Sequence, residues 1–587
     1  MPHRSFTELI PEHLKPYVAH QDASLYTAMD HAAWRFILKI SKAFFSGNAH
    51  QKYLDGLKET GISTDRIPRI EEMDECLKAH GWRAVAVNGF IPPAAFMEFQ
   101  SLGILPIACE MRTLDHLAYT PAPDIVHEAA GHAPIIADPE YAAYLKNYGE
   151  VSRKALSSRK DMEVYEAIAR LSVVKEDPSS TAADIDAAQK ALDRAIESVD
   201  YLTESTYLAR MNWWTVEYGL VGDEKNPKIY GAGLLSSVGE SYHCLSSEVK
   251  KIPFTLACIE TPYDITRPQP QLFVTKNFGE LTQVLEEFAR TMAFRIGGAK
   301  ALAKALRSAT VSTTVLNSGL QISGVIEKFD VEGSSSGSED VSFIRWKGPV
   351  QLAFEDREIE DQGPTVHGHG FSTPLGAVRL PGGKVLKDLS DVTDSQLSEM
   401  GFTAGKSGKI VFASGIELTG RLAQSFRKKD KTLILTFDPC EIKKGSEVLY
   451  QPAWGRMDLA CGGTIPSVFG GAADRAAYMR ATKTTDYSAK KHKSNLTDEN
   501  RPLNALYEKF AKARAQRNAP EVAAIVDQLD QNFPEDWLLR MEILEAQSEL
   551  GLKLESRLRA RLAEIAKTRK DRGELIDRGL KLLGMEK

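Results

Sequence analysis

Residues 119–141, YTPAPDIVHEAAGHAPIIADPEY, contain side chains that could bind a metal ion. His127 and His132 lie five residues apart, and Glu128 directly follows the first histidine. Imidazole nitrogens and carboxylate oxygens are common ligands of zinc and of non-haem iron(II). The first hypothesis from this stretch is therefore a metal centre.

The spacing of the two histidines separates two kinds of metal site. Pro123 and Asp124 are typical of a helix start and Gly131 of a helix stop, which predicts one short helix for both histidines. The zinc-peptidase motif HExxH places its histidines four residues apart, about 400° along a helix, so both rings share one face. Five residues leave the rings about 140° out of line on a regular helix, unless the helix ends or distorts at Gly131. A zinc peptidase with Glu128 as its base is therefore disfavoured.

Two histidines of looser geometry suit a facial triad, in which two imidazoles and one carboxylate leave open positions on iron(II). The best candidate for the carboxylate is Glu217 in NWWTVEYG, residues 212–219. Trp213 and Trp214 stand four and three residues before it, so a helix would place an aromatic wall beside the acid. A carboxylate near tryptophans needs a partner, and a metal ion is a natural one.

The composition and the hydrophobic pattern of the sequence change three times along the chain. Residues 1–308 are rich in helical patterns, and we expect a mainly α catalytic domain there. Residues 309–470 contain short β-branched and aromatic segments bounded by glycine and charged residues, which predicts a β-rich domain. A polar linker is expected over 471–499 and a helical C-terminal region over 500–587. The predicted fold is multidomain in this order.

The β-rich segment also contains a faint internal repeat. SGLQISGVIEKF (318–329) is similar to SGIELTGRLAQSF (414–426), and FEDREI (354–359) is similar to FDPCEI (437–442). Two copies of one strand unit would explain the similarity. The same region contains HGHG, in which His367 and His369 are expected to lie in a plain loop and not in a second metal site.

Composition excludes several classes of protein. The chain has 587 residues, 43% of them hydrophobic and 26% charged, and its net charge of −6 gives no sign of a nucleic-acid or anionic-membrane surface. Its six cysteines show no CxxC pairing, which favours a reducing compartment. No apolar run approaches the roughly 20 residues that span a bilayer, and the N-terminus lacks a signal-peptide core. We expect a cytoplasmic protein without nucleic-acid or membrane partners.

Three long motifs in a fixed order carry a resemblance to a known family. PDxxHExxGH is followed by WxTVEYG and then by YGAGLLSSVGE at 230–240. This series resembles the aromatic amino acid hydroxylases, the family of phenylalanine, tyrosine and tryptophan hydroxylases. The resemblance runs from YTAMDHAAWRFI to FARTMAFRI and covers about half of the chain, and it leaves the C-terminal half unexplained.

The resemblance implies roles for individual residues. The iron ligands, and with them the catalytic centre, would be His127, His132 and Glu217. The amino acid substrate would be held by Arg112, Thr120, Pro123, Trp213, Tyr218, Ser236 and Glu240. Among these, a planar guanidinium suits a carboxylate and an aromatic slot suits a ring. The pterin would contact Val87, Gly89, Phe90, Phe96 and Glu128. Pro92, Pro93, Ala94 and Ala95 replace more polar residues that are usual in the pterin loop.

The implied activity is ring hydroxylation of an aromatic amino acid by iron(II), a tetrahydropterin (tetrahydrobiopterin or a related reduced pterin) and dioxygen. L-Phenylalanine, converted to L-tyrosine, is the preferred substrate. Tyrosine or tryptophan hydroxylation is one alternative, because all three enzymes share the motifs quoted above. A non-catalytic scaffold on a retired hydroxylase domain is another. The C-terminal region could serve homo-oligomerisation or regulation, and the sequence leaves both open.

Overall fold

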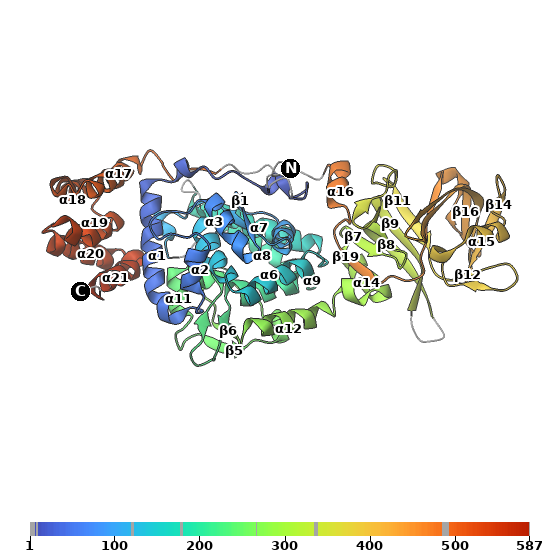
Figure 1. Cartoon of the computed structure of the whole chain (residues 1–587), viewed down its shortest axis with the longest axis horizontal. Coiled ribbons are helices and arrows are strands. Elements are labelled where there is room, and N and C mark those ends of the chain that lie inside the picture. The colour runs from blue at the N-terminus through green and yellow to red at the C-terminus, as the bar shows by residue number, and fades with distance from the viewer. Residues whose placement is uncertain are drawn as a thin grey trace.

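A computed structural model describes residues 6, 10–118, 122–176, 180–265, 267–333, 339–483 and 492–585. The molecule is elongated, with the N-terminal region in the middle and the two later parts of the chain at opposite ends (Figure 1). The β-rich region lies beside α14 and α16, and the C-terminal helices α17–α21 lie beside α1.

Helices dominate the N-terminal region, in agreement with the helical patterns of its sequence. They are α1 (Ala28–Asn48), α2 (Tyr53–Glu59), α3 (Ile70–Leu77), α4 (Pro93–Ser101), α5 (Ala133–Ile136), α6 (Pro139–Ser152), α7 (Arg159–Glu176), α8 (Ala182–Glu197), α9 (Glu204–Asn212), α10 (Ala232–Ser236), α11 (Val238–His243), α12 (Phe278–Ala289), α13 (Ala293–Ile296) and α14 (Gly298–Ser308). Two π-helical turns, η6 (Val126–His132) and η7 (Trp213–Glu217), interrupt the regular helices.

Helix α1 shows how local sequence sets these elements. Thr27 accepts a hydrogen bond from the backbone N–H of Asp30, and the Asp30 carboxylate accepts one from the N–H of Thr27. This reciprocal capping box satisfies N–H groups that have no partner within a helix, so it fixes the start of α1. Trp34, Ile37 and Leu38 are then at most 1% exposed, and they join the largest apolar core of the molecule.

Two small sheets complete the N-terminal region. Strands β1 (Arg83–Val87) and β2 (Ile104–Ala108) pair in parallel, with Val87 opposite Ala108. The other sheet has the order β4-β3-β6-β5. Its strands are β3 (Leu220–Val221), β4 (Lys228–Ile229), β5 (Lys250–Pro253) and β6 (Gln271–Thr275). Strand β2 lies against η6, so the first sheet supports the turn that carries both histidines.

Strands form the second region, as its sequence predicted. They are β7 (Ser312–Val315), β8 (Leu320–Gly333), β9 (Glu339–Phe354), β10 (Arg357–Glu358), β11 (Gly370–Pro374), β12 (Val378–Arg379), β13 (Val385–Leu386), β14 (Ser407–Phe412), β15 (Ile416–Lys428), β16 (Lys431–Lys444), β17 (Glu447–Tyr450), β18 (Met457–Ala460) and β19 (Ser467–Gly470), with helix α15 (Asp394–Glu399). Their antiparallel pairing builds two sheets that meet where Gly376 N–H donates to the Gly462 carbonyl at 3.3 Å.

The two sheets repeat one topology. Strands β7, β8, β9 and β11 pair in sequence in the first sheet, as β14, β15, β16 and β18 do in the second. Gly324 and Gly420, equivalent in the first pair of repeated segments, both lie at a register shift opposite the next long strand. The second pair of segments is not equivalent, because Phe354 pairs with Leu320 whereas Phe437 pairs with Leu422.

Each sheet also receives one strand from the other half of the repeat. Strand β12 follows the first unit along the chain but pairs with β14 of the second unit. Strand β19 follows the second unit but pairs with β7 of the first. This exchange joins the two units, because neither sheet is complete without a strand from the other.

The C-terminal helices are α17 (Arg501–Ala515), α18 (Ala519–Asn532), α19 (Leu538–Leu550), α20 (Glu555–Thr568) and α21 (Lys570–Met585). Their buried side chains, including Trp537, share one continuous apolar core with Phe36 of α1. Within 471–499, the segment expected to be a polar linker, helix α16 (Arg475–Thr482) forms and is capped by Asp474. The division of the chain into four domains stays a prediction.

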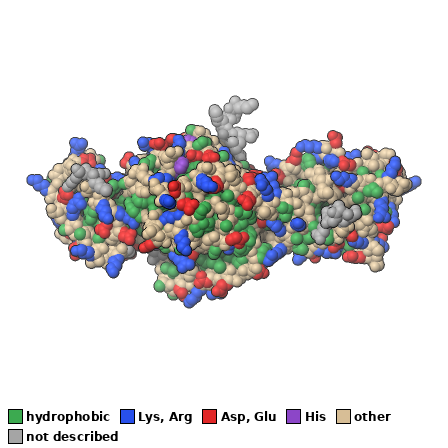
Figure 2. All heavy atoms as spheres, turned by 90° about the horizontal axis from the view of Figure 1, so that it is seen from below, with side chains coloured by type: hydrophobic (Ala, Val, Ile, Leu, Met, Phe, Trp, Pro, Cys, Tyr) green, Lys and Arg blue, Asp and Glu red, His purple; other side chains and the backbone are tan. Residues whose placement is uncertain are grey.

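The face of the molecule drawn in Figure 2 has no region of a single charge. In the view of Figure 2, basic and acidic side chains alternate across the three parts of the molecule, with hydrophobic side chains scattered between them. None of the helices that the structure describes is long and apolar enough to cross a membrane. The loop with His367 and His369 is a turn, and His367 Nε2 lies 2.8 Å from Gln362 Oε1.

Candidate active site

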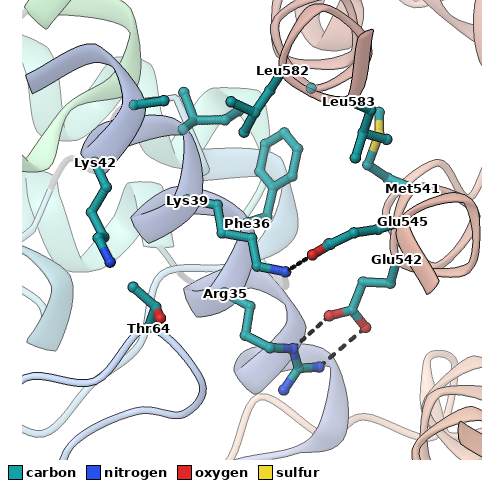
Figure 3. Close-up of a pocket in the computed structure, with 13 residues that line it drawn as sticks. Arg35, Phe36, Lys39, Lys42, Thr64, Met541, Glu542, Glu545, Leu582 and Leu583 are labelled. Carbon is teal, nitrogen blue, oxygen red and sulfur yellow. Dashed lines mark hydrogen bonds and ion pairs between the residues drawn. The ribbon is translucent and has the colours of Figure 1, made fainter. Parts of the chain in front are cut away.

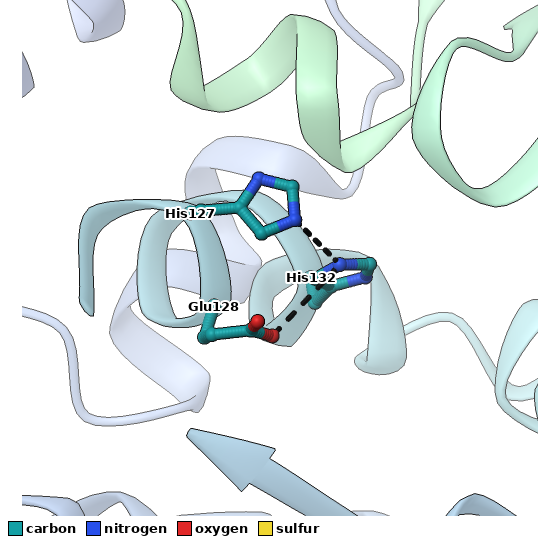
Figure 4. A group of neighbouring side chains, drawn as sticks. All are labelled: His127, Glu128 and His132. Carbon is teal, nitrogen blue, oxygen red and sulfur yellow. Dashed lines mark hydrogen bonds and ion pairs between the residues drawn. The ribbon is translucent and has the colours of Figure 1, made fainter. Parts of the chain in front are cut away.

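The two histidines of the PDxxHExxGH motif point at one another across a π-helical turn (Figure 4). Their Nε2 atoms lie 3.1 Å apart. In a π-helical turn the hydrogen bonds run from residue i+5 to residue i, so side chains five residues apart come to one side. The Ala133 N–H donates to the Glu128 carbonyl in this pattern. The distortion that the spacing requires is thus a widened helix.

The helix does not stop at Gly131, as the sequence had suggested, but continues into α5. Gly131 serves close packing, because a Cβ atom built there would lie 2.7 Å from the Ala232 carbonyl oxygen of α10. Such a contact is far shorter than van der Waals packing allows. A larger residue would push α10 away from η6 or distort the turn that aligns the histidines.

Glu217 completes the group from a second π-helical turn. Its two carboxylate oxygens lie 3.4 Å from His127 Nε2 and 3.4 Å from His132 Nε2. Glu128 also lies near, with its Oε2 atom 3.9 Å from His132 Nε2, and its ligand atom falls within 4.8 Å of both histidines. Glu217 is the carboxylate nearer to both imidazoles. The structure therefore brings together the three side chains that the sequence nominated as ligands.

The charges of Glu217, His132 and His127, together with burial, shift the pKa values of these three side chains. Burial raises the pKa of Glu217, but the two imidazoles outweigh burial and lower it to about 2. Burial lowers the pKa of His132, and the Glu217 carboxylate outweighs it and raises the value to about 8. Burial dominates at His127 and lowers its pKa to about 4. A metal cation would replace the proton that His132 shares with Glu217.

His127 is oriented by a serine. Ser236 Oγ lies 3.0 Å from His127 Nδ1 and donates to the Ala232 carbonyl at 2.8 Å. The imidazole is held at Nδ1, and Nε2 faces the other ligands. Hydrogen bonds of this kind fix the ring and the tautomer of metal-binding histidines. The sequence placed Ser236 near the backbone groups of the substrate, which stays a prediction, and its hydroxyl also contacts a metal-site histidine.

Arg112 is completely buried and paired with Asp124. Its Nε and one Nη donate to the two Asp124 carboxylate oxygens at 2.8 Å each, and the other Nη donates to the Ser236 carbonyl at 2.9 Å. These contacts occupy three of the five N–H donors of a guanidinium. Among the described contacts, one N–H on each Nη has no acceptor, and two such N–H groups together form the fork that suits a carboxylate. Asp124 also accepts from the N–H of His127 at 3.0 Å.

Three aromatic rings form a rigid wall next to Glu217. Trp213 stacks on Tyr218 with ring centroids 4.5 Å apart, and on Tyr263 with centroids 4.3 Å apart. Trp214 is fully buried, its Nε1 donates to the Thr261 carbonyl, and its ring meets Tyr263 edge-on with centroids 6.5 Å apart.

Glu240 lies behind this wall. Its carboxylate accepts a hydrogen bond of 2.8 Å from the Tyr218 hydroxyl. Burial raises the pKa of Glu240 to about 7, although the Tyr218 hydrogen bond opposes the shift. Pro123 is half-buried directly before Asp124, and Thr120 lies outside the described residues.

The residues expected at the pterin follow β1. Val87 belongs to a separate apolar cluster, and Phe96 of α4 packs against that cluster together with Tyr17. Gly89 adopts a positive φ of 61° and its N–H donates to Glu110 Oε2 at 3.0 Å. Phe90 follows in the loop and is half-buried. Proline at the start of α4 fits the first turn of a helix, so the unusual Pro92-Pro93 pair starts this element.

Glu128 has a buried carboxylate oxygen without a hydrogen-bond partner among the described residues. Among the described residues, its Oε2 atom is shielded from solvent and makes no hydrogen bond. Burial raises the pKa of Glu128 to about 8, so the carboxyl group can keep its proton near neutral pH. A protonated carboxyl both donates and accepts, which suits the amide edge of a pterin ring. A metal at the histidines would lower this pKa again.

Sequence reasoning missed three contributors to the site. Asp124 was interpreted only as a helix start, although it also fixes Arg112. Glu110 holds the Gly89 loop, and Tyr263 backs Trp213. An acid after the proline of the PD pair was a signal for Asp124. Glu110 and Tyr263 come from segments without any motif, so only the folded chain could identify them.

Comparisons with known proteins identify the family of this chain. A sequence model of the family described as biopterin-dependent aromatic amino acid hydroxylase matches residues 18–178 and 179–333. The phenylalanine-4-hydroxylase of Pseudomonas aeruginosa is 30% identical over 264 residues, which are 45% of this chain and 84% of the relative. That of Ralstonia nicotianae is 32% identical over 272 residues, 46% of this chain and 73% of the relative.

Among solved structures, the phenylalanine hydroxylase of Chromobacterium violaceum with bound iron(III) and 7,8-dihydrobiopterin is similar to this chain. The two share 28% sequence identity over 47% of this chain and 86% of that chain, with a TM-score of 0.38. The family match spans more than half of this chain and includes all the residues of the site. The chain therefore belongs to the biopterin-dependent aromatic amino acid hydroxylases and is an aromatic amino acid monooxygenase.

Proposed function

We propose that this protein is an iron(II)- and tetrahydropterin-dependent monooxygenase that hydroxylates the ring of L-phenylalanine to give L-tyrosine. The observation that carries the proposal is the convergence of His127, His132 and Glu217 within 3.4 Å of one another in a buried place. Two imidazoles and one carboxylate on one side of a metal are the donor set of iron(II) oxygenases. Phenylalanine as the substrate is supported by the names of the relatives.

The three ligands would hold iron, and Glu128 with the Gly89 loop would contact the pterin. When bound, iron(II) and the reduced pterin supply the electrons that activate dioxygen. The residues of the protein bind and orient the amino acid substrate. The two remaining N–H groups of Arg112 receive the substrate carboxylate, and the ionised Glu240 attracts its ammonium group.

The stacked wall of Trp213, Tyr218 and Tyr263 holds the substrate ring in place. Because these rings pack face to face at 4.5 Å or less, they cannot turn without losing contact. A rigid apolar wall orients the substrate ring and keeps water from the metal. Ser236 keeps His127 in the orientation that leaves its Nε2 for the metal.

The test is the reaction itself. Purified, iron(II)-loaded protein receives L-phenylalanine, tetrahydropterin and dioxygen, and tyrosine is measured by chromatography, with parallel reactions that offer tyrosine or tryptophan or omit the pterin. We expect pterin-dependent tyrosine formation that falls at least about 100-fold in His127→Ala and Glu217→Gln, because losing a ligand costs more than losing its support. His369→Ala and Glu224→Gln are matched controls, since both side chains are exposed and outside the site.

The outcomes separate the alternatives. Turnover of only tyrosine or only tryptophan keeps the reaction class and corrects the substrate. No product from any of the three amino acids, with iron bound at about one per chain, would reject the catalytic proposal and favour a scaffold.

A further inference from the structure

The C-terminal region, residues 492–585, packs on the N-terminal region beside the site. Phe36 of α1 lies edge-on to Trp537, with ring centroids 4.8 Å apart. Arg35 donates to both carboxylate oxygens of Glu542, and Lys39 pairs with Glu545 (Figure 3). A cavity of about 240 Å³ remains between α1, α19 and α21. The contact thus combines apolar packing with ion pairs around an open space.

Asn495 of the C-terminal region contacts the segment after β2 that carries Arg112. Its Nδ2 donates to the Met111 carbonyl at 2.9 Å and to Asp30 Oδ1 at 2.9 Å. Asp30 caps α1, so one amide ties the start of that helix to the residue before Arg112. The ring of His492 packs on Tyr26, whose hydroxyl donates to the Cys109 carbonyl at 2.7 Å. Residues 109–111 are therefore held by two contacts to or beside the C-terminal region.

Arg578 of α21 reaches the helix that carries Glu240. One Nη donates to the Val238 carbonyl at the start of α11, and the guanidinium lies 3.9 Å over the Tyr242 ring. The same start of α11 binds the loop after Arg112, since Ser237 Oγ donates to the Ala118 carbonyl at 3.0 Å. Arg572 pairs with Asp115 in that loop. Helix α21 thus contacts both partners of the junction between the loop and α11.

The β-rich end of the molecule contacts the other half of the site. Arg475 of α16 donates to Glu98 Oε2 at 2.7 Å and to the Arg153 carbonyl at 2.8 Å. Glu98 lies on α4, the helix of Phe96. In the described contacts, each end of the molecule therefore contacts different elements of the site. The C-terminal region contacts the elements of Arg112 and Glu240, and α16 contacts the element of Phe96.

We propose that the C-terminal region positions the amino-acid side of the site, the loop 111–118 and helix α11, and so affects the affinity for the aromatic amino acid more than that for the pterin, whose loop it meets, in the described contacts, only through Glu110. Asn495 and Arg578 are the positioning residues. The inference rests on the proposed function, because it takes Arg112 and Glu240 as the groups that hold the amino acid. Neither positioning residue contacts the ligand directly.

The mechanism is one of preorganisation. Arg112 and Glu240 come from separate elements, and they can hold one small zwitterion only while their separation is fixed. Without the Asn495 and Arg578 hydrogen bonds, loop 111–118 and α11 would sample more arrangements, and binding would have to order them. One net hydrogen bond corresponds to about a three- to tenfold change in affinity.

The test compares two variants with two controls in the full-length, iron-loaded protein. Asn495→Ala and Arg578→Gln each remove one positioning contact. Lys581→Gln removes the same charge from an exposed site on α21, and Arg475→Gln breaks the contact to α4. KM for L-phenylalanine, KM for tetrahydropterin and kcat are measured. Binding of L-phenylalanine is also followed without turnover, by tryptophan fluorescence.

We expect KM for L-phenylalanine and its dissociation constant to rise about three- to tenfold in Asn495→Ala and Arg578→Gln, with a smaller rise in the pterin KM in Asn495→Ala, through Glu110, and none in Arg578→Gln. Arg578→Lys keeps a donor and the charge, so it should restore part of the affinity. Both controls should leave the phenylalanine KM at the wild-type value. Unchanged phenylalanine affinity in both variants overturns the inference, and so does an equal rise in the pterin KM or in the Arg475→Gln control.

Failure of the proposed function has a different signature. In that case the wild-type protein itself forms no tyrosine and binds no L-phenylalanine, and this inference falls with it. A wild-type enzyme that is active while its variants keep wild-type affinity overturns the inference alone.

Discussion

The guanidinium of Arg112 lies in two-point contact with the carboxylate of Asp124, and the side chains are 0% and 3% exposed. Asp124 in turn caps the N–H of His127. One buried aspartate therefore links the expected substrate arginine to the first histidine of the metal group. Both ends of the candidate site depend on its charge.

Replacement of Asp124 by asparagine should destabilise the protein and weaken substrate binding together. Breaking a buried ion pair costs about 3–5 kcal/mol, because the remaining charge is left without a partner. We expect a lower midpoint of chemical denaturation and a higher KM for the amino acid. The double variant Asp124→Asn/Arg112→Gln should recover part of the stability but no binding. Equal recovery of both would show that Arg112 does not contact the substrate.

Replacement of Ser236 by alanine should weaken iron binding. The change removes the hydroxyl 3.0 Å from His127 Nδ1, so the imidazole loses its fixed orientation. Losses of such supporting contacts cost about 10- to 100-fold in metal affinity or activity. Competition with a chelator, followed by the metal content, measures the effect. Ser237→Ala is a neighbouring control whose hydroxyl contacts Ala118 and not a histidine, and a loss of iron as large in that variant would count against the role of Ser236.

The pH dependence of kcat/KM for the amino acid should report Glu240. Its pKa is raised to about 7, so the carboxyl is protonated below that pH and attracts an ammonium group only above it. We expect kcat/KM to rise as the pH increases through about 7. Tyr218→Phe removes the hydrogen bond that lowers this pKa, so the rise should move to higher pH. A flat profile between pH 6 and 8 would exclude Glu240 from substrate binding.

The raised pKa of Glu240 also makes the free energy of unfolding depend on pH. Because the pKa of Glu240 is raised in the folded state, the native protein binds more protons than the unfolded chain between the ordinary value and about pH 7. The contribution of this group to the free energy of unfolding is present at low pH and is lost as the pH rises through that window. Glu240→Gln should remove this slope, which denaturation at several pH values can measure.

Replacement of Gly131 by alanine should damage the metal site without removing a ligand. The new Cβ would lie 2.7 Å from the Ala232 carbonyl oxygen, so η6 and α10 must move apart. Both carry groups of the site, His132 and Ser236, and the three ligand atoms would lose their alignment. We expect reduced iron content and activity. Gly47→Ala is a control, because a Cβ there meets no atom within 4 Å. Normal iron binding in Gly131→Ala would mean that the turn adapts.

The sequence by itself determined the chemistry of the site. Residue types and order in PDxxHExxGH and WxTVEYG nominated His127, His132 and Glu217, and the five-residue spacing already required a helix that ends or distorts at Gly131. Changes in hydrophobic period also separated the helical, β-rich and helical parts of the chain, because such periods follow from local backbone geometry. The resemblance to the family nominated Arg112 as a residue that binds the substrate.

Tertiary structure alone decided how these parts meet. The distortion is a π-helical turn, not a stop at Gly131, because the packing of η6 against α10 sets that backbone. Asp124, Tyr263 and Asn495 gain their contacts from residues distant in the sequence, and no local pattern encodes such pairs. The exchange of β12 and β19 and the reach of α21 to α11 depend on long-range packing in the same way. Local sequence patterns thus identify the groups that can react, and long-range contacts determine the positions of these groups in the folded protein.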